Sequence, residues 1–324
     1  MRLKRSFFFV IFSLITLFSS VNAFAAQQSF QSWLANFKIE AVASGINPQF
    51  FDEVFKGMTI GHRQIHFDKT QPEHRITYTE YQSKRISKHR IYLGKQALKK
   101  YGPVLKNIGK EYGVDYCVVT AIWGMETAYG NYMGGFDVIR SLATLAYEGR
   151  RAEFFRNELI IALHILQEGH VSRQYFKGEW AGGSGHSQFL PSSWKQYAVD
   201  YTGDGHKDIW TTKEDAFASM ANYLHTNGWK YGEPIRAHVI LPHGFNENLV
   251  GYKVKKSVRE WETLGVRAAP GWRLPTHNIT ASIIQPYGGP TLMIFNNWRI
   301  IMTYNRSTFY AGAISKLADE VCGR

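Results

Sequence analysis

The sequence contains little cysteine, few acidic residues relative to basic ones, and no repeat or low-complexity tract. Its 324 residues include two cysteines, Cys117 and Cys322, and neither has the neighbouring Cys and His ligands that a structural zinc site needs. In an oxidising compartment the two could pair, or Cys117 could be a free thiol buried in an apolar helix. The hydrophobic share of 44% and charged share of 20% are those of an ordinary folded globular protein.

Long apolar runs are also absent, apart from one at the N-terminus. Met1–Arg5 contains three cations and precedes the apolar run Ser6–Ser20 and an Ala-x-Ala step at 23–25. This order is typical of a secretory signal peptide, and the run is shorter than the roughly 20 residues of a membrane span. We therefore predict a cleaved signal peptide over 1–26 and a soluble periplasmic protein. No cysteine lies near the cleavage region, so we expect no membrane anchor.

Acidic residues number 26 against 38 lysines and arginines, which gives a net charge of +12. Three of these positive charges lie in the predicted signal peptide, so +9 is left on the mature chain. A basic protein attracts polyanions, and export disfavours nucleic acid as the partner. The carboxylates of cell-wall peptides are the alternative polyanion, although charge that serves only solubility explains the excess equally well.

Helical patterns dominate the first two thirds of the chain, and short strand-like patterns follow them. This indicates an α+β fold that is predominantly helical, with a small β-rich insert. The predicted helices include Cys117–Tyr129, Ser141–Tyr147, Ala152–Gly169, Asp215–Asn227 and the chain from Tyr304 onward. The predicted organisation is an N-terminal helical region over 27–112, a core over 113–233, a small β domain over 234–298 and a C-terminal segment over 299–324 that returns to the core.

Glu126 is the first candidate for chemistry. It lies near the end of an apolar helix, in the segment Ala-Ile-Trp-Gly-Met-Glu-Thr-Ala-Tyr-Gly. Loss of water around the charged form should raise the pKa of such a carboxyl group, which suits a general acid that protonates a glycosidic oxygen. A structural glutamate paired with an arginine is the alternative.

A second catalytic carboxylate is not evident. Asp137 and Glu148 are near in sequence, but both lie on segments predicted to be helical scaffold. Some glycosidases need only one carboxylate, because the N-acetyl group of the substrate attacks the anomeric carbon. A single glutamate and an N-acetylated wall sugar fit that scheme.

The segment Asp200–Asp215 resembles a calcium loop. Oxygen ligands alternate at Asp200, Thr202, Asp204 and the backbone of His206, and a glycine lies where such a loop turns sharply. The twelfth position, a bidentate glutamate in an EF-hand, is a threonine here, so Asp208, Glu214 or Asp215 must close the shell. We predict a structural Ca²⁺ or Na⁺ here, with an Asx-rich turn that holds no ion as the alternative, and no cofactor for the chemistry itself.

Together these strings resemble the lytic murein transglycosylase B family, from about Phe30 to the C-terminal helix. The matching strings, in family order, are Gly-Met-Glu-Thr-x-Tyr-Gly at 124–130, Arg-Ser-Leu-Ala-Thr-Leu-Ala-Tyr at 140–147, Arg-Arg-Ala-Glu-Phe-Phe at 150–155, Trp-Ala-Gly at 180–182, Gln-Phe-Leu-Pro-Ser-Ser at 188–193, the acidic loop, and Tyr-Asn at 304–305.

The resemblance implies a lysozyme-like catalytic core at 113–233 with an added helical domain and a small β domain around a groove. It also implies non-hydrolytic cleavage of the MurNAc-β-1,4-GlcNAc bond in peptidoglycan, which leaves 1,6-anhydro-MurNAc ends. Glu126 matches the family's catalytic glutamate, acting first as acid and then as base with help from the N-acetyl group. We expect a monomer acting on glycan strands.

The resemblance also implies substrate-binding and cation-binding residues. The residues that match groove and muropeptide-binding positions are Tyr81, Arg150, Arg151, Gln188, Tyr304, Asn305 and Tyr310. The residues that match the cation site are Asp200, Thr202, Asp204, His206 and Asp215, the last only if one residue is inserted before it. For either arginine, a salt bridge that anchors the fold is the alternative role.

Two positions depart from the family. Glu179 replaces a small hydroxyl residue that orients the acid, and a carboxylate there would either raise the pKa of Glu126 or face solvent. Ser184 replaces a methionine, which would loosen the packing of the groove. Two other functions stay open at this point: a hydrolytic muramidase, and a non-catalytic cell-wall-binding protein of the same fold.

Overall fold

The computed structural model describes residues 28–70, 76–276 and 278–324, so the predicted signal peptide lies outside the described residues. Thirteen α-helices are present in the described part of the chain. They are α1 (Phe30–Ala43), α2 (Pro48–Phe55), α3 (His62–Lys69), α4 (Tyr78–Arg85), α5 (Lys88–Tyr112), α6 (Tyr116–Thr127), α7 (Val138–Glu148), α8 (Ala152–Gln167), α9 (Pro191–Tyr197), α10 (Lys213–Thr226), α11 (Val258–Thr263), α12 (Asn296–Tyr304) and α13 (Thr308–Cys322). The predicted α+β, predominantly helical fold is confirmed.

Within the described ranges, seven short strands form two antiparallel sheets. The first sheet pairs β1 (Phe136–Asp137) with β2 (Lys177–Gly178). The second has the order β4-β6-β7-β3-β5, with β3 (Arg236–Ile240), β4 (Lys256–Ser257), β5 (Arg267–Ala268), β6 (Thr280–Ile284) and β7 (Leu292–Ile294). This larger sheet and α11 enclose their own apolar core, which includes Trp261 and Phe295.

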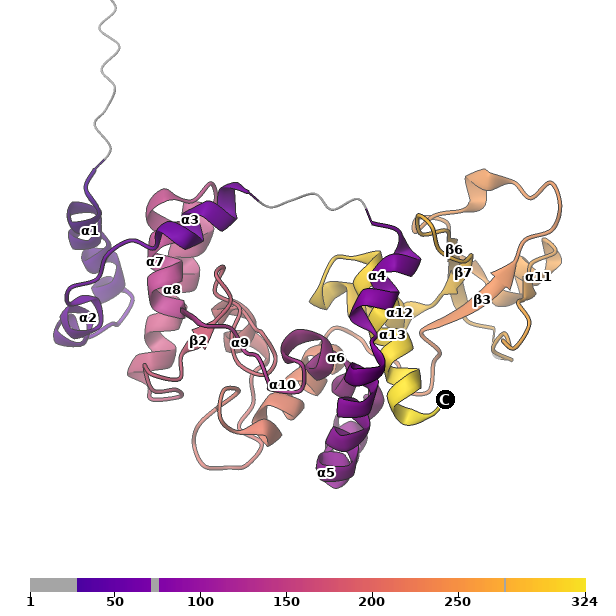
Figure 1. The fold of residues 1–324 in the computed structure, drawn as a ribbon, viewed down its shortest axis with the longest axis horizontal. Helices are drawn as coiled ribbons and strands as arrows, with labels where there is room; N and C mark the ends of the chain where they lie inside the picture. Colours follow the sequence, from indigo (N-terminus) through magenta and orange to yellow (C-terminus); the bar gives the residue numbers. More distant parts are fainter. Residues whose placement is uncertain (1–27, 71–75, 277) are drawn as a thin grey trace, which may run out of the picture.

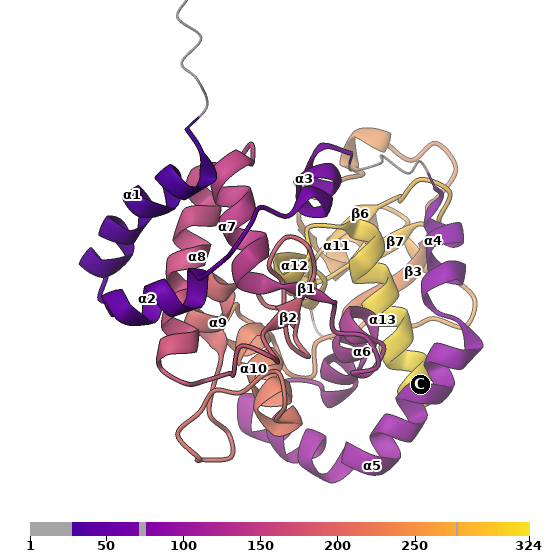
Figure 2. The same cartoon turned by 60° about the vertical axis from the view of Figure 1, so that its left-hand side comes forward.

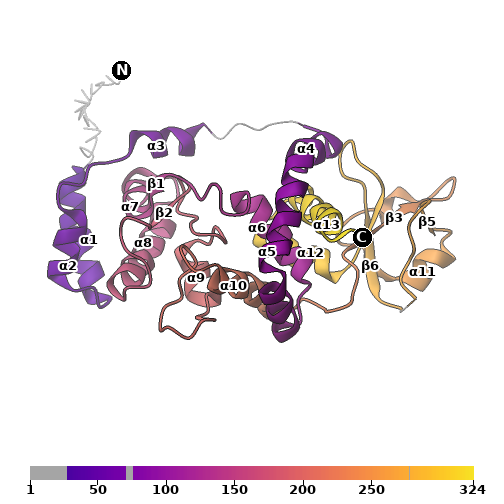
Figure 3. The same cartoon turned by 60° about the horizontal axis from the view of Figure 1, so that its bottom comes forward.

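The elements follow one another along the long axis of the molecule (Figure 1). Helices α1 and α2 lie at one end, α7 and α8 come next, α5, α6 and α10 occupy the middle, and the larger sheet lies at the other end. A second view shows the same order (Figure 3). No described helix is both long enough and apolar enough to cross a membrane.

Local capping explains where the central helices begin. The side chain of Ser87 accepts a hydrogen bond from the Arg90 amide and starts α5, and the side chain of Asp115 does the same for α6 through the Cys117 amide. Gly113, with φ of 61°, ends α5 in the left-handed conformation that glycine adopts readily. A tight turn therefore sets α6 directly against α5.

Two predicted helix boundaries are wrong. The helix predicted to run to Tyr129 ends at Thr127, because the two residues that follow adopt left-handed backbone conformations. The chain from Tyr304 onward is not one helix: α12 ends at Tyr304, and α13 begins at Thr308 with Ser307 as its cap. The break places Tyr310 near the beginning of α13.

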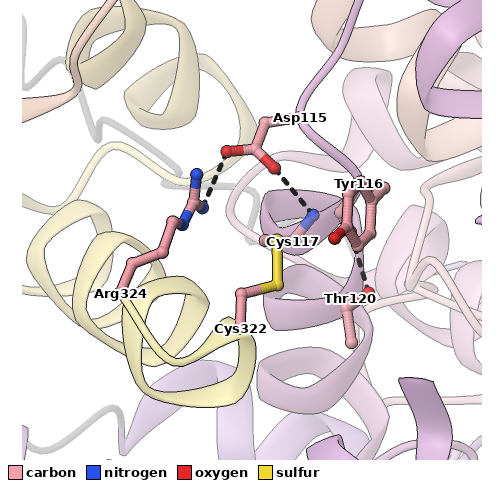
Figure 4. Close-up of a disulfide and its surroundings, with 6 residues drawn as sticks. All are labelled: Asp115, Tyr116, Cys117, Thr120, Cys322 and Arg324. Atoms are coloured by element: carbon pink, nitrogen blue, oxygen red, sulfur yellow. Dashed lines mark hydrogen bonds and ion pairs between the residues drawn. A yellow bond between two sulfur atoms is a disulfide. The ribbon is translucent and has the colours of Figure 1, made fainter. Parts of the chain in front are cut away.

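Helices α6 and α13 pack against each other and are covalently linked. Cys117 near the start of α6 and Cys322 at the end of α13 form a disulfide with Cα atoms 6.1 Å apart, which resolves the alternative left open by the sequence. Beside it, Arg324 donates to Asp115 at 2.8 Å, so a salt bridge joins the same two helix ends (Figure 4).

Candidate active site

Glu126 lies at the end of α6 that is opposite the disulfide. Its Oε1 accepts a hydrogen bond of 2.5 Å from the hydroxyl group of Tyr310. Tyr310 is buried and lies in the first turn of α13. The helix pair therefore joins the predicted acid to a predicted groove residue that is distant in sequence.

The surroundings of Glu126 raise the affinity of its carboxyl group for a proton. Burial raises its pKa from 4.5 to about 7, the hydrogen bond from Tyr310 and the charge of Arg85 oppose this rise, and the charge of Glu179 adds to it. Part of the side chain is still reachable from solvent, although protein atoms surround the carboxyl group densely. Near neutral pH the group can therefore exist in both the protonated and the ionised form, as an acid that later acts as a base requires.

The backbone after Glu126 is strained. Ala128 and Tyr129 have φ of 49° and 61°, which non-glycine residues rarely adopt. The ring of Tyr129 packs against two glycines that have no side chain to collide with it. A Cβ on Gly94 or on Gly124 would come within 2.4 Å of Tyr129. These two glycines therefore let the ring support the turn that follows the acid.

An aromatic and cationic wall lies beside Glu126. Tyr81 on α4 packs against Phe309 with ring centroids 5.7 Å apart, and the guanidinium group of Arg85 lies 5.7 Å from the centre of the Tyr81 ring. Burial, and then the charge of Glu126, raise the pKa of Tyr304, whose hydroxyl group donates to the Ser187 carbonyl at 2.5 Å. Tyr81, Tyr304 and Tyr310 therefore meet near the acid, as the resemblance implies.

The glycine-rich loop that precedes α9 holds the next predicted residue. Gln188 has φ of 50°, and its amide group donates to the carbonyls of Met133 at 3.1 Å and Gly185 at 2.9 Å. Ser184 is buried and accepts a hydrogen bond of 3.2 Å from Trp210. This serine is thus held by a specific partner, and the predicted loosening of the packing at this point is not evident.

Glu179 directly follows β2 and is half-buried. Its amide donates to the Gly183 carbonyl at 2.8 Å, and its carbonyl accepts from the Gly182 amide at 3.0 Å. Among the described residues no salt bridge or side-chain hydrogen bond neutralises its carboxyl group. Burial raises the pKa of Glu179, and its charge raises that of Glu126. Of the two alternatives, an effect on the acid therefore fits better than a side chain that only faces solvent.

Three predicted groove residues are exposed and make no recorded contact with Glu126. Arg150 donates to the Asp68 carbonyl at 2.8 Å and lies 3.6 Å from its carboxylate. Arg151 stacks over Phe154 at 3.9 Å. Asn305 forms the end of α12. Arg150 thus makes the anchoring contact that was its alternative role, while its exposed surface is free to meet a ligand.

The acidic loop gathers carboxylates from two segments. Ligand oxygens of Asp200, Asp204 and Asp215 all lie within 4.8 Å of one another. The buried Asp215 accepts hydrogen bonds from the amides of Tyr201, Thr202 and Asp208. It thereby reaches the loop from the first turn of α10 and joins the group of three carboxylates, of which Asp208 is not a member. Such a set of oxygens fits a hard cation.

Arg85 is a site residue that the sequence alone did not indicate. It is exposed, and it lies in a basic stretch in which no single cation stands out. Only the fold, which packs α4 against α13, brings its charge near Glu126. No local sequence pattern marks such a residue.

Comparison with known proteins adds to this geometry. A family model described as transglycosylase SLT domain matches residues 29–319. Membrane-bound lytic murein transglycosylase B from Escherichia coli (strain K12) is 33% identical over 249 residues, covering 75% of this chain and 67% of that protein. The structure of SltB3 from Pseudomonas aeruginosa in complex with NAG-NAM-pentapeptide aligns with a TM-score of 0.89 and 42% identity, over 92% of this chain and 80% of that one. The calcium complex of Escherichia coli lytic transglycosylase Slt35 aligns with a TM-score of 0.78 and 29% identity, over 89% of this chain and 92% of that one.

Proposed function

This chain belongs to the transglycosylase SLT domain family, as a lytic transglycosylase that acts on peptidoglycan, and we propose that it cleaves the MurNAc-β-1,4-GlcNAc bond without water to leave 1,6-anhydro-MurNAc ends. The observation that supports this most directly is the state of Glu126. Its pKa of about 7 and its contact with Tyr310 suit one residue that gives and then takes back a proton.

In the first step, the protonated carboxyl group of Glu126 donates its proton to the glycosidic oxygen. The bond between C1 of MurNAc and that oxygen breaks, and its electron pair stays on the departing GlcNAc. The carbonyl oxygen of the MurNAc N-acetyl group supports the positive charge that develops at C1. The hydroxyl group of Tyr310 then stabilises the Glu126 carboxylate, because a hydrogen bond to a charged acceptor is a strong one.

In the second step, the Glu126 carboxylate takes the proton of the MurNAc 6-hydroxyl group. The oxygen of that group attacks C1 and closes the anhydro ring, and the N-acetyl group is released. Glu126 is protonated again, so the proton balance of the cycle closes with no water consumed.

We propose that the other predicted residues bind the glycan and its peptides. Tyr81 and Tyr304 present aromatic surface beside the acid, and Gln188 presents an amide close to the substrate's N-acetyl group. Arg150 and Arg151 suit the carboxylates of the stem peptide. Asn305 and Tyr310 complete the polar side of the groove.

We further propose that Asp200, Thr202, Asp204, His206 and Asp215 hold a Ca²⁺ or Na⁺ ion. Bound there, the ion would neutralise carboxylates that repel one another and would join the loop to α10, with no part in the chemistry. We also propose a monomeric periplasmic enzyme with no nucleic-acid partner and the domain boundaries predicted from the sequence.

Hydrolysis is the second candidate, and Glu179 is the observation that favours it. Its charge acts on Glu126, and a second carboxylate in reach of the acid could activate a water molecule. We prefer transglycosylation to hydrolysis, because the N-acetyl group and the 6-hydroxyl group of MurNAc supply both nucleophiles and no second carboxylate is needed.

Mass spectrometry of purified sacculi after digestion separates the two reactions. We expect muropeptides with 1,6-anhydro-MurNAc ends, and no products from the Glu126→Gln variant. Reducing MurNAc ends would refute the transglycosylase mechanism. Unchanged turnover by the Glu126→Gln variant would refute the role of Glu126. A Glu179→Gln variant tests whether any hydrolytic fraction depends on the second carboxylate.

A further inference from the structure

A row of lysines runs along the outer face of α5. Lys88, Lys95, Lys99, Lys106 and Lys110 follow one another at intervals of seven, four, seven and four residues. At 3.6 residues per turn these positions share one face of a regular helix, and along a straight helix they would span about 33 Å at about 1.5 Å per residue. Pro103 lies inside α5 between Lys99 and Lys106, where a proline bends a helix. We call these five residues the lysine stripe.

The lysine stripe faces solvent and has no counter-ions of its own. All five side chains are exposed. In the described part of the chain, none of their ammonium groups lies within 4.0 Å of a carboxylate oxygen. Tyr92 lies on the same face and is 57% exposed. The opposite face of α5 packs on α6, α10 and α13, and the helix forms the rim of the molecule (Figure 2).

The first end of the lysine stripe adjoins the active site. Arg90, two residues after Lys88, contacts the sulfur of Met125 at 3.3 Å, and Met125 precedes Glu126 in α6. Arg85, whose charge acts on Glu126, lies three residues before Lys88. The two arginines near the acid and the first lysine of the stripe are therefore neighbours along the chain.

The other end of the lysine stripe reaches a cavity of about 900 Å³ between α5, α13 and the larger sheet. Lys106 and Lys110 line this cavity together with Arg273. Two further arginines there are neutralised by salt bridges, Arg236 to Asp319 at 3.1 Å and Arg324 to Asp115 at 2.8 Å. Glu233 is the remaining acidic residue in the lining, so the cavity keeps net positive charge.

We propose that the lysine stripe is a second peptidoglycan-binding surface, which holds an uncleaved part of the wall through the carboxylates of its stem peptides. A linear row of separated ammonium groups complements a polymer that presents carboxylates at intervals along its length. The exposed ring of Tyr92 adds a flat apolar surface of the kind on which a sugar stacks.

An anionic membrane surface is the other polyanion that a basic helix can bind. Membrane-binding helices place large apolar side chains beside their cations, and the outer face of α5 offers only Tyr92. Adjacency to the active site also favours the polymer that the active site cleaves. The proposal rests on the proposed function for the identity of that polymer.

Sedimentation with purified sacculi tests the proposal in the Glu126→Gln background, so that binding is read without digestion. The test variant changes all five lysines of the stripe to Gln. The control variant changes the same number of exposed lysines elsewhere, namely Lys56, Lys195, Lys253, Lys255 and Lys316. Glutamine suits a helix about as well as lysine does, and an unchanged melting temperature verifies that each variant is folded.

We expect the stripe variant to bind sacculi roughly tenfold more weakly, from several exposed charge pairs acting together, and the control to bind like the parent. Amidation of the sacculus carboxylates should lower binding of the parent at least to the level of the stripe variant, because it also removes the partners proposed for Arg150 and Arg151. Equal binding by the stripe and control variants would overturn the proposal. So would stripe-dependent binding to phosphatidylglycerol vesicles without loss on sacculi, which would assign this surface to a membrane. Failure to find anhydro products would refute the mechanism and leave this binding result unaffected.

Discussion

Replacing Glu126 with an uncharged glutamine should raise the free energy of unfolding, and the gain should be large only at high pH. In the folded protein its pKa is about 7 instead of 4.5. Each unit of pKa difference corresponds to about 1.36 kcal/mol, so the ionised carboxylate destabilises the folded state by about 3 kcal/mol once it is fully formed. The Glu126→Gln variant keeps the size of the side chain and an oxygen that accepts from Tyr310, but it never ionises.

The direction in which the free energy of unfolding changes with pH follows from the number of protons that the folded and unfolded states bind. Between pH 4.5 and about 7 the folded state holds a proton on Glu126 that the unfolded state has released, so the free energy of unfolding falls as pH rises through this window. The Glu126→Gln variant does not lose stability in this way, because its side chain does not ionise. Its advantage over the parent should be about 3 kcal/mol above pH 7 and below about 1 kcal/mol at pH 5.

Urea unfolding followed by tryptophan fluorescence measures this difference at pH 5 and pH 8.5. Glu320→Gln is a matched control, because Glu320 is an exposed glutamate on α13, and it should show no such pH-dependent gain. A Glu126→Gln variant no more stable than the parent at pH 8.5, or equally stabilised at both pH values, would refute the reasoning that burial raises the pKa of the acid.

Three further predictions concern other parts of the fold. Tyr310→Phe removes the hydrogen bond that lowers the pKa of Glu126, so the alkaline limb of the kcat/KM profile should move up by about one pH unit; a shift to lower pH would contradict this. With Ca²⁺ in the loop, chelation should lower the melting temperature of the parent but not of an Asp215→Asn variant; equal melting with and without chelator would exclude Ca²⁺, because a chelator does not remove Na⁺. Reduction of the disulfide between Cys117 and Cys322 should lower the free energy of unfolding by up to about 5 kcal/mol, because the bond closes a very long loop; unchanged urea unfolding under reducing conditions would contradict this.

Much of the fold was predictable because its signals are local. Apolar periodicity located the helices, and prolines, a local signal, lie in the first turns of α2 and α9 at Pro48 and Pro191. Boundaries failed where side-chain caps decide them, as at Ser307. They also failed at Ala128, where tertiary packing of the neighbouring Tyr129 holds the backbone in a left-handed conformation that local propensity disfavours.

The candidate site likewise combines features that the local sequence indicates with features that only the tertiary structure sets. The apolar context of Glu126 indicated a raised pKa, and burial is the largest cause of that rise. Its remaining partners are set by tertiary structure: Tyr310 is 184 residues away in sequence, and Arg85 and Glu179 lie on other elements. The resemblance suggested Tyr310, but no local pattern showed that its hydroxyl group donates to the acid.

The pairing of α6 with α13 gives the disulfide a consequence for catalysis. Both helices are fixed at one end by the Cys117–Cys322 bond, and at the other end they carry Glu126 and Tyr310, joined by a 2.5 Å hydrogen bond. The segment between α6 and α13 contains the glycine-rich loop, the acidic loop and the larger sheet, so the two helices that carry the acid and its hydrogen-bond donor are joined along the chain only by a long path. A covalent bond that limits sliding of one helix along the other therefore keeps the hydroxyl group within reach of the carboxyl group, and the pKa of Glu126 depends on that reach.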